Sequence, residues 1–286
     1  MPPKLAFSAN AFKKTDFSAA AREIARIGYR GVEVYADHPH FYPLETPHEV
    51  RRETAHLLRG LGLRVSNVNA FTMFRVGDTW RPSYLEHDPK LRQLRLDHTV
   101  AALELARDLG CATVSTEPGG PLDPPMTREE GFELFLKGID EVMERTSHLD
   151  ALLLVEPEPG LLLETTAHAE ELLDAATDPR LSINFDAGHF FCVGEDPAEA
   201  VFRLQSRFDH VHIEDIAASR EHVHLVPGDG AMDFGALFDA LRQTGYDGFV
   251  TVELYPFEDN PVKVAERAME HLVPIWKRVF GEDPRA

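Results

Sequence analysis

Four residues that can bind a divalent cation are spaced 30, 26 and 41 positions apart: Glu156, Asp186, His212 and Glu253. Each lies at or near the end of a short apolar segment of strand character, and in the last three segments polar and apolar residues alternate. Burying three carboxylates and an imidazole costs free energy unless a cation compensates. These ligand types suit Mn²⁺, Co²⁺, Zn²⁺ or Mg²⁺. We therefore expect one divalent ion per chain, with Mn²⁺ as the first choice.

Each of these residues, taken alone, also has an ordinary structural explanation. A glutamate at a strand end is commonly hydrated, Asp186 can cap the turn that follows it, and His212 can be a hydrogen-bonded core histidine. His210 lies one layer deeper and is either structural or in contact with a ligand of the ion. The coincidence of four ligand types on four consecutive strands favours the metal site.

Short apolar segments alternate with segments of helical period along the whole chain, which predicts eight strands and eight helices. This inventory is typical of a single (β/α)8 TIM barrel covering residues 1–286, with its active site at the C-terminal mouth. A doubly wound open sheet is the alternative, but no GxGxxG follows the first strand. The predicted strands are Lys4–Ser8, Gly31–Tyr35, Arg64–Asn69, Thr113–Thr116, Ala151–Glu156, Leu181–Asp186, His210–Glu214 and Phe249–Leu254. The predicted helices are Phe17–Ile27, Pro47–Leu61, Asp97–Leu109, Arg128–Thr146, Ala167–Ala176, Pro197–Arg207, Phe234–Thr244 and Pro261–Val279.

The charge balance limits the partners that the protein can have. The 286 residues include 29 Lys and Arg against 48 Asp and Glu, a formal charge of −19. Such an acidic chain is not expected to bind nucleic acid or an anionic membrane. Two cysteines, no signal-like N-terminus and no long apolar run predict a cytoplasmic protein. A homo-oligomer is compatible with the sequence, which does not specify one.

Several motifs resemble those of a known superfamily. They are Val155-Glu156-Pro157, Phe185-Asp186-Ala187-Gly188-His189, His210-Val211-His212-Ile213-Glu214-Asp215, Val226-Pro227-Gly228-Asp229-Gly230 and Val252-Glu253. With them the whole chain resembles the sugar phosphate isomerase/epimerase superfamily of xylose isomerase-like TIM barrels. The resemblance is strongest in the second half of the chain and is more specific for the fold than for the substrate.

The resemblance also implies roles for individual residues. It makes Glu156, Asp186, His212 and Glu253 the metal ligands and gives His189 a contact with substrate oxygens. Related ketose epimerases have an arginine a few residues after the metal-binding histidine. Ala218 stands six residues after His212 here, so Arg220 is the candidate for a substrate contact.

The function that we expect from the sequence is a metal-dependent isomerase or epimerase of a sugar or sugar phosphate. Its substrate would be a small polyhydroxylated carbonyl compound, and Glu156 and Glu253 would transfer the proton through an enediolate. One alternative keeps the site but expels a hydroxyl, as in a dehydratase of inosose or dehydroshikimate type. Glu33 and Asn69, near the ends of two strands, would either reach the substrate or be hydrated.

Two further alternatives belong to other functional classes. An endonuclease IV-like phosphodiesterase needs several zinc ions, for which additional histidines are available, although the charge of −19 disfavours a DNA partner. These histidines are His38, His40, His189, His222 and His224. A sugar- or metal-binding barrel without catalytic activity is the other alternative.

Overall fold

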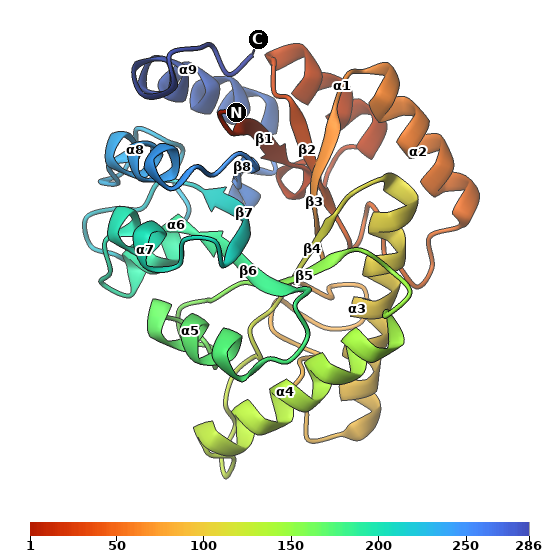
Figure 1. Cartoon of the computed structure of the whole chain (residues 1–286). Helices are drawn as coiled ribbons and strands as arrows, with labels where there is room; N and C mark the ends of the chain where they lie inside the picture. Colours follow the sequence, from red (N-terminus) through yellow and green to blue (C-terminus); the bar gives the residue numbers. More distant parts are fainter. Residues whose placement is uncertain (286) are drawn as a thin grey trace.

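Eight parallel strands close into a barrel in the computed structural model, which describes residues 1–285 (Figure 1). The strands follow one another in chain order, and the last pairs with the first, with Lys4 opposite Phe249. The fold class predicted from the sequence is therefore confirmed. The strands are β1 (Lys4–Ser8), β2 (Gly31–Tyr35), β3 (Arg64–Asn69), β4 (Thr113–Thr116), β5 (Leu152–Val155), β6 (Leu181–Asp186), β7 (Phe208–Ile213) and β8 (Phe249–Val252).

Helices surround the barrel on its outer side (Figure 1). Within the described residues the α-helices are α1 (Phe17–Ile27), α2 (His48–Gly60), α3 (Pro89–Leu109), α4 (Arg128–Arg145), α5 (Thr166–Ala175), α6 (Ala187–Cys192), α7 (Pro197–Arg203), α8 (Phe234–Thr244) and α9 (Pro261–Phe280). Two short 3₁₀ helices, η1 (Ala9–Phe12) and η2 (Tyr255–Phe257), follow β1 and β8.

Three helices differ from the prediction by more than two residues, and one of them is α7, which ends at Arg203 and not at Arg207. Helix α3 begins at Pro89 and not at Asp97, because Asp88 accepts a hydrogen bond from the Lys90 amide and proline is well suited to the first helical turn. Helix α6 was not predicted, and its six residues follow β6 directly. Asp186 is its N-cap and accepts a hydrogen bond from the His189 amide. One predicted metal ligand thus also sets the backbone position of His189.

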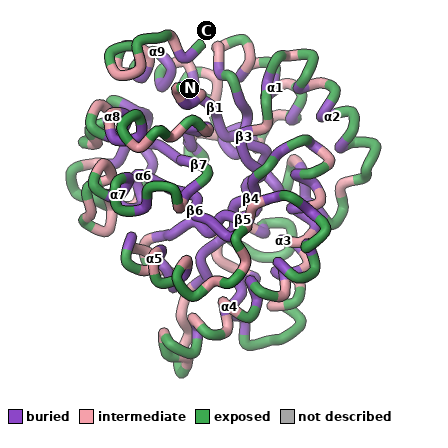
Figure 2. The backbone as a smooth tube through the Cα atoms, viewed as in Figure 1, coloured by how far each residue is buried: buried purple, intermediate pink, exposed green. Residues whose placement is uncertain are grey.

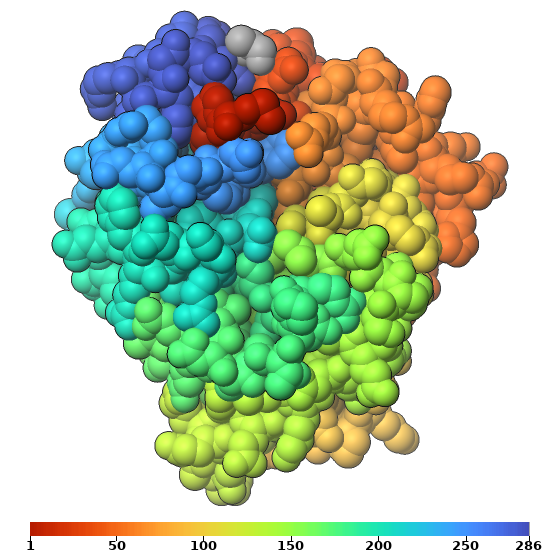
Figure 3. Space-filling view, viewed as in Figure 1, coloured from red at the N-terminus to blue at the C-terminus, as the bar shows by residue number. Residues whose placement is uncertain are grey.

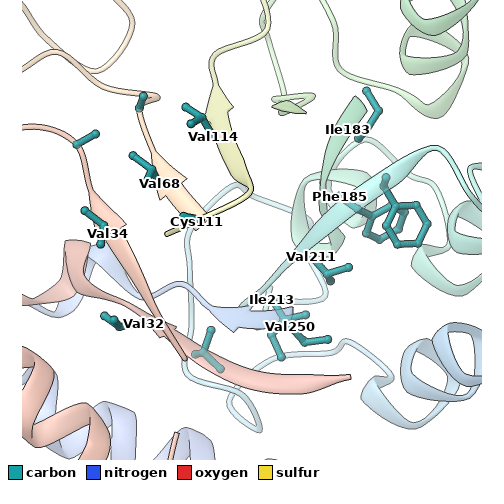
Figure 4. Packing of buried hydrophobic residues seen from close by; sticks show 14 of the residues in the cluster. Val32, Val34, Val68, Cys111, Val114, Ile183, Phe185, Val211, Ile213 and Val250 are labelled. Atoms are coloured by element: carbon teal, nitrogen blue, oxygen red, sulfur yellow. The ribbon is translucent and has the colours of Figure 1, made fainter. Parts of the chain in front are cut away.

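Alternate strand residues face the helices and form the hydrophobic core. Val32, Val34, Val211 and Ile213 belong to this core and are fully buried (Figure 4). Figure 2 shows buried segments running through the strands, with exposed segments on the outer helices. Side chains of the opposite parity face the barrel interior, and many are polar. They include Ser8, Glu33, Asn69, Ser115, Asn184, Asp186, His210, His212 and Thr251, all of which are buried.

The two ends of the chain meet on one side of the molecule. In Figure 3 the N-terminal segment lies beside the C-terminal one, and Tyr29 after α1 donates a hydrogen bond to the Ala265 carbonyl of α9 at 2.9 Å. Barrel closure therefore brings together residues more than 200 positions apart. Among the described residues, no helix combines the length and apolar character needed to cross a bilayer.

Candidate metal centre

Glu156, Asp186, His212 and Glu253 converge at the C-terminal ends of β5 to β8. One ligand atom from each lies within 4.8 Å of the others. His212 Nδ1 is 2.9 Å from Glu156 Oε1, 3.8 Å from Asp186 Oδ2 and 3.9 Å from Glu253 Oε1. All four residues are buried. The structure thus places the four predicted ligands around one point at the mouth of the barrel.

The cluster contains buried oxygens without partners and several negative charges, which a bound cation would compensate. Glu156 Oε2 and Asp186 Oδ2 are buried and have no hydrogen-bond partner. Burial lowers the pKa of His212, but the charges of Glu33, Glu156 and Glu253 outweigh this and raise it well above its usual value. The surrounding carboxylates therefore stabilise positive charge at this point. Three carboxylates and one imidazole form a donor set that fits a divalent ion.

Asparagine side chains fix one oxygen of Glu253. Asn10 Nδ2 and Asn69 Nδ2 donate hydrogen bonds to Glu253 Oε1 at 2.8 and 3.1 Å. Burial raises the pKa of Glu253 to about 8, and the negative charge of Glu156 adds to this effect although His212 opposes it. Asn10 and Asn69 thus orient a carboxylate that is costly to ionise without a nearby cation.

His189, the predicted substrate contact, lies beside the cluster on α6. Its Nδ1 donates to the Pro157 carbonyl at 2.9 Å, and its Nε2 lies 3.2 Å from Glu158 Oε2 and 3.7 Å from Asp186 Oδ2. Burial lowers the pKa of His189, but the charges of Asp186 and Glu158 raise it to about 9. The surrounding carboxylates therefore favour the protonated imidazole, which donates from Nδ1 to Pro157 and pairs through Nε2 with Glu158.

Two further histidines join His189. Nitrogen atoms of His189, His222 and His224 lie within 4.8 Å of one another, and His222 Nδ1 is 3.3 Å from Glu158 Oε1. The other two histidines of the phosphodiesterase alternative take no part in this cluster. His40 Nε2 donates to the Thr15 carbonyl at 3.0 Å, and His38 lies 3.9 Å from Glu45 on an exposed segment.

The structure places Arg220 away from the four ligands. Its Nη1 donates to the Phe191 carbonyl at 2.7 Å, and its guanidinium group lies 4.4 Å from the centre of the Phe191 ring. Arg220 lines a separate cavity of about 440 Å³ beside α7 and α8, together with Asp196 and Asp233. The structure brings His189 to the cluster but does not bring Arg220 there.

A cavity of about 270 Å³ opens over the cluster. Glu156, Glu158, His189, His222 and Glu253 line its polar side. Aromatic side chains form another part of the wall and come from β2, the segment after β3, and η2. They are Tyr35, Phe71, Phe74, Trp80 and Tyr255. Such a wall can pack against the C–H face of a small polyol while the carboxylates and imidazoles contact its oxygens.

The segment between β3 and α3 is held in place by Asp37. This buried carboxylate accepts hydrogen bonds from the amides of Phe74 and Arg75, at 2.5 and 3.1 Å, and from the Thr72 hydroxyl at 2.8 Å. The aromatic wall therefore depends on a residue that has no contact with the cavity itself.

Sequence reasoning missed several lining residues. Asn10, Lys13, Trp80, Glu158 and Tyr255 lie in loops or short helices, where no periodic pattern indicates the direction of a side chain. Glu158 had one usable signal, because Glu156-Pro157-Glu158 places a second carboxylate two residues after a predicted ligand. Glu33 and Asn69 are both buried and not hydrated at strand ends.

A family model described as xylose isomerase-like TIM barrel matches residues 21–275. A Lacticaseibacillus casei protein named inosose dehydratase is 26% identical over 278 residues, covering 91% of this chain and 90% of that protein.

Solved structures with the same fold include a D-tagatose 3-epimerase-like protein and the IolI protein with a bound zinc atom. The first has a TM-score of 0.80 and 21% identity, covering 96% of this chain and 99% of that one. The second has a TM-score of 0.80 and 16% identity, covering 98% and 100%. Because the family model spans most of the sequence, this chain belongs to the xylose isomerase-like TIM barrel family.

Proposed function

We propose that this protein is a divalent-metal-dependent dehydratase of a keto-polyol of inosose type. One observation carries the proposal: a buried cluster of three carboxylates and one imidazole lies under an aromatic-walled cavity, in a chain that aligns over 91% of its length with an inosose dehydratase. The relative favours this alternative over the isomerase or epimerase that we expected from the sequence. Glu156, Asp186, His212 and Glu253 would hold the ion.

The first step is removal of a proton from the carbon next to the carbonyl group. A divalent ion, when bound, would polarise that carbonyl and make the proton more acidic. Glu156 is suited to accept the proton, because it lines the cavity and its buried Oε2 has no hydrogen-bond partner. Glu253, oriented by Asn10 and Asn69, is the second candidate for proton transfer.

The second step is loss of the neighbouring hydroxyl as water. The C–O bond breaks, a C=C bond forms from the electron pair left by the first proton, and the hydroxyl must receive a proton. Glu158 and His189 line the same cavity, and Glu158 Oε2 lies 3.2 Å from His189 Nε2. We assign them the role of proton donor to the departing hydroxyl.

The charged side chains that line the cavity support an uncharged substrate. Three carboxylates, from Glu156, Glu158 and Glu253, line it. Among the described residues that line it, Lys13 is the one lysine or arginine, and its Nζ is paired with Glu258 at 2.8 Å. The lining residues that the structure describes therefore offer a phosphate group no unpaired lysine or arginine, and we propose a neutral polyol ketone.

Turnover of an inosose by the reconstituted protein tests this function. Purified protein, stripped of metal and reloaded separately with Mn²⁺, Co²⁺, Zn²⁺ or Mg²⁺, is incubated with the substrate and analysed by mass spectrometry and NMR. We expect loss of one water per substrate with at least one metal and none without metal. Change of configuration without loss of water would instead support the epimerase. No conversion of inososes or ketoses with any metal would contradict an enzymatic role.

A further inference from the structure

We infer that Glu33 is a positioning residue that orients His212 for metal binding. The inference rests on the proposed metal site and adds to it a residue from the opposite half of the chain. Glu33 lies on β2 and His212 on β7, 179 positions apart, and His212 Nε2 is 2.6 Å from Glu33 Oε2. Neither side chain is exposed to solvent.

The contact selects which nitrogen of His212 can bind a cation. A carboxylate only accepts hydrogen bonds, so Nε2 must carry the hydrogen that Glu33 receives. The other nitrogen, Nδ1, faces Glu156, Asp186 and Glu253. With the hydrogen on Nε2 retained by Glu33, Nδ1 is the nitrogen whose hydrogen, shared with Glu156 in the ion-free site, a cation would replace. Carboxylates that accept from the second nitrogen of a metal-binding histidine fix its tautomer and increase its basicity.

Glu33 is itself held in a fixed orientation. Asn67 Nδ2 donates to Glu33 Oε2 at 3.0 Å, and Asn69 Nδ2 lies 3.4 Å from Glu33 Oε1. Asn67 Nδ2 also donates to Ser115 Oγ at 2.9 Å on β4. The neighbours Val32 and Val34 pack in the hydrophobic core. Rotation of the strand that moved the Glu33 carboxylate would therefore also remove these two side chains from the core. This network fixes Glu33 before any ion binds.

Two other roles for Glu33 fit the geometry less well. A separate cation between Glu33, His210 and His212 would need a free nitrogen on His210. Both of its nitrogens are occupied, Nδ1 by Asn184 Oδ1 and Nε2 by Thr251 Oγ1, each at 2.8 Å. A substrate contact would need access to the cavity over the cluster, and Glu33 is fully buried beneath it. Orientation of His212 is the role that accounts for the contacts of Glu33 with His212, Asn67 and Asn69.

The test compares metal affinity in Glu33→Gln with that in Glu117→Gln. Glutamine keeps the volume and the acceptor oxygen of Glu33 but removes its charge. Glu117 is the matched control, because it is another fully buried glutamate of the barrel, accepts from the Tyr84 amide at 3.0 Å and lies 3.9 Å from Arg95, away from the cluster. Zn²⁺ affinity is measured by chelator competition, and the Co²⁺ absorption spectrum reports the ligand environment. Neither readout requires substrate.

We expect Glu33→Gln to weaken Zn²⁺ binding by about 10- to 100-fold and to shift the Co²⁺ bands. Glu117→Gln should keep the wild-type affinity and spectrum even if its melting temperature falls. Wild-type affinity in a folded Glu33→Gln would overturn the inference while leaving the metal site intact. If the wild type binds no divalent ion, both the proposed function and this inference fail. The failure of the inference alone can therefore be distinguished from the failure of the proposed function.

A second variant covers the case in which Glu33→Gln does not fold. Asn67→Ala removes one donor that holds Glu33 but leaves the carboxylate in place. We expect a few-fold weaker Zn²⁺ affinity, in the same direction as in Glu33→Gln. Unchanged affinity in this variant would then overturn the inference.

Discussion

Asn10 Nδ2 donates a hydrogen bond to Glu253 Oε1 at 2.8 Å, although 243 positions separate the two residues. Asn10 lies in η1 directly after β1, and Glu253 directly follows β8. The contact therefore crosses the closure of the barrel and fixes one oxygen of a proposed metal ligand. It leaves the second oxygen of Glu253 free of this constraint.

Replacing Asn10 should impair catalysis without preventing folding. A hydrogen bond to a charged group contributes about 1.5–3 kcal/mol, and part of this would be lost when Asn69 alone orients Glu253. We expect Asn10→Ala to lower kcat by about tenfold at saturating metal. Steady-state kinetics of dehydration would measure the effect. Asn260→Ala, at an exposed position before α9, is the control and should keep the wild-type rate. A wild-type rate in Asn10→Ala would show that this orientation is dispensable.

Removing the metal should destabilise the protein. Without an ion, Glu156, Asp186 and Glu253 stand close together in a buried site. An ion at about 100 times its dissociation constant stabilises the native state by about 2.7 kcal/mol. We expect elemental analysis to find one divalent ion per chain and a chelator to lower the melting temperature.

Asp186→Asn is the control for metal removal. Asparagine can still cap α6 through its side-chain oxygen but lacks the ligand charge. Its melting temperature should therefore respond little to the chelator. An unchanged wild-type melting curve after complete metal removal would place the ion outside the barrel mouth.

Turnover in deuterated water should label the carbon beside the carbonyl group. Recovered substrate gains deuterium there if deprotonation by Glu156 or Glu253 is reversible. General acid–base groups contribute about 10²–10⁴ in rate, so Glu156→Gln and Glu253→Gln should lose activity in that range. Glu144→Gln, at an exposed position of α4, is the matched control. Retained activity in either site variant would remove that residue from proton transfer.

His98 should make the fold sensitive to acid. It is buried on α3, and its Nε2 donates to the Ala36 carbonyl at 3.0 Å. Burial lowers the pKa of His98 from 6.5 to about 3, with the charge of Arg95 adding to this effect. Between these values the unfolded state binds the proton and the native state does not, so stability falls as the pH falls. At pH 5 this single group costs about 2 kcal/mol relative to neutral pH.

Urea unfolding of wild type and His98→Gln at pH 8 and pH 5 would measure this effect. The variant lacks the titrating group, so its loss of stability between the two pH values should be smaller by about 2 kcal/mol. His56→Gln changes an exposed histidine of α2 and should follow the wild type. Equal losses in all three proteins would show that His98 does not set the acid sensitivity.

The sequence predicted the strands better than the surroundings of the site. Strands β1 to β4 and β6 have their predicted bounds, because their apolar parity and flanking glycines are local signals. The convergence of Asp186 and His212 could be predicted because both lie on the inward parity of neighbouring strands. The contact between Glu33 and His212 could not, because it crosses the barrel between β2 and β7, which are not neighbouring strands.

The positions of side chains in loops could not be predicted from sequence patterns. Glu158 and His222 meet because the segment after β5 and the segment after β7 approach each other over the mouth. No periodicity in those segments specifies that approach. Arg220 also lies in such a segment. Its spacing from His212 departs from the family pattern, and the structure directs its side chain to the Phe191 carbonyl.

Because β1 pairs with β8, the complete metal centre forms only when the barrel closes during folding. Asn10 and Glu33 precede Glu253 by more than 200 positions, so both are synthesised well before it. An incomplete chain has only three of the four proposed ligands and lacks the partner of Asn10. A divalent ion would therefore bind to all four ligands only once the barrel has closed. Its binding would then slow the unfolding of the closed barrel.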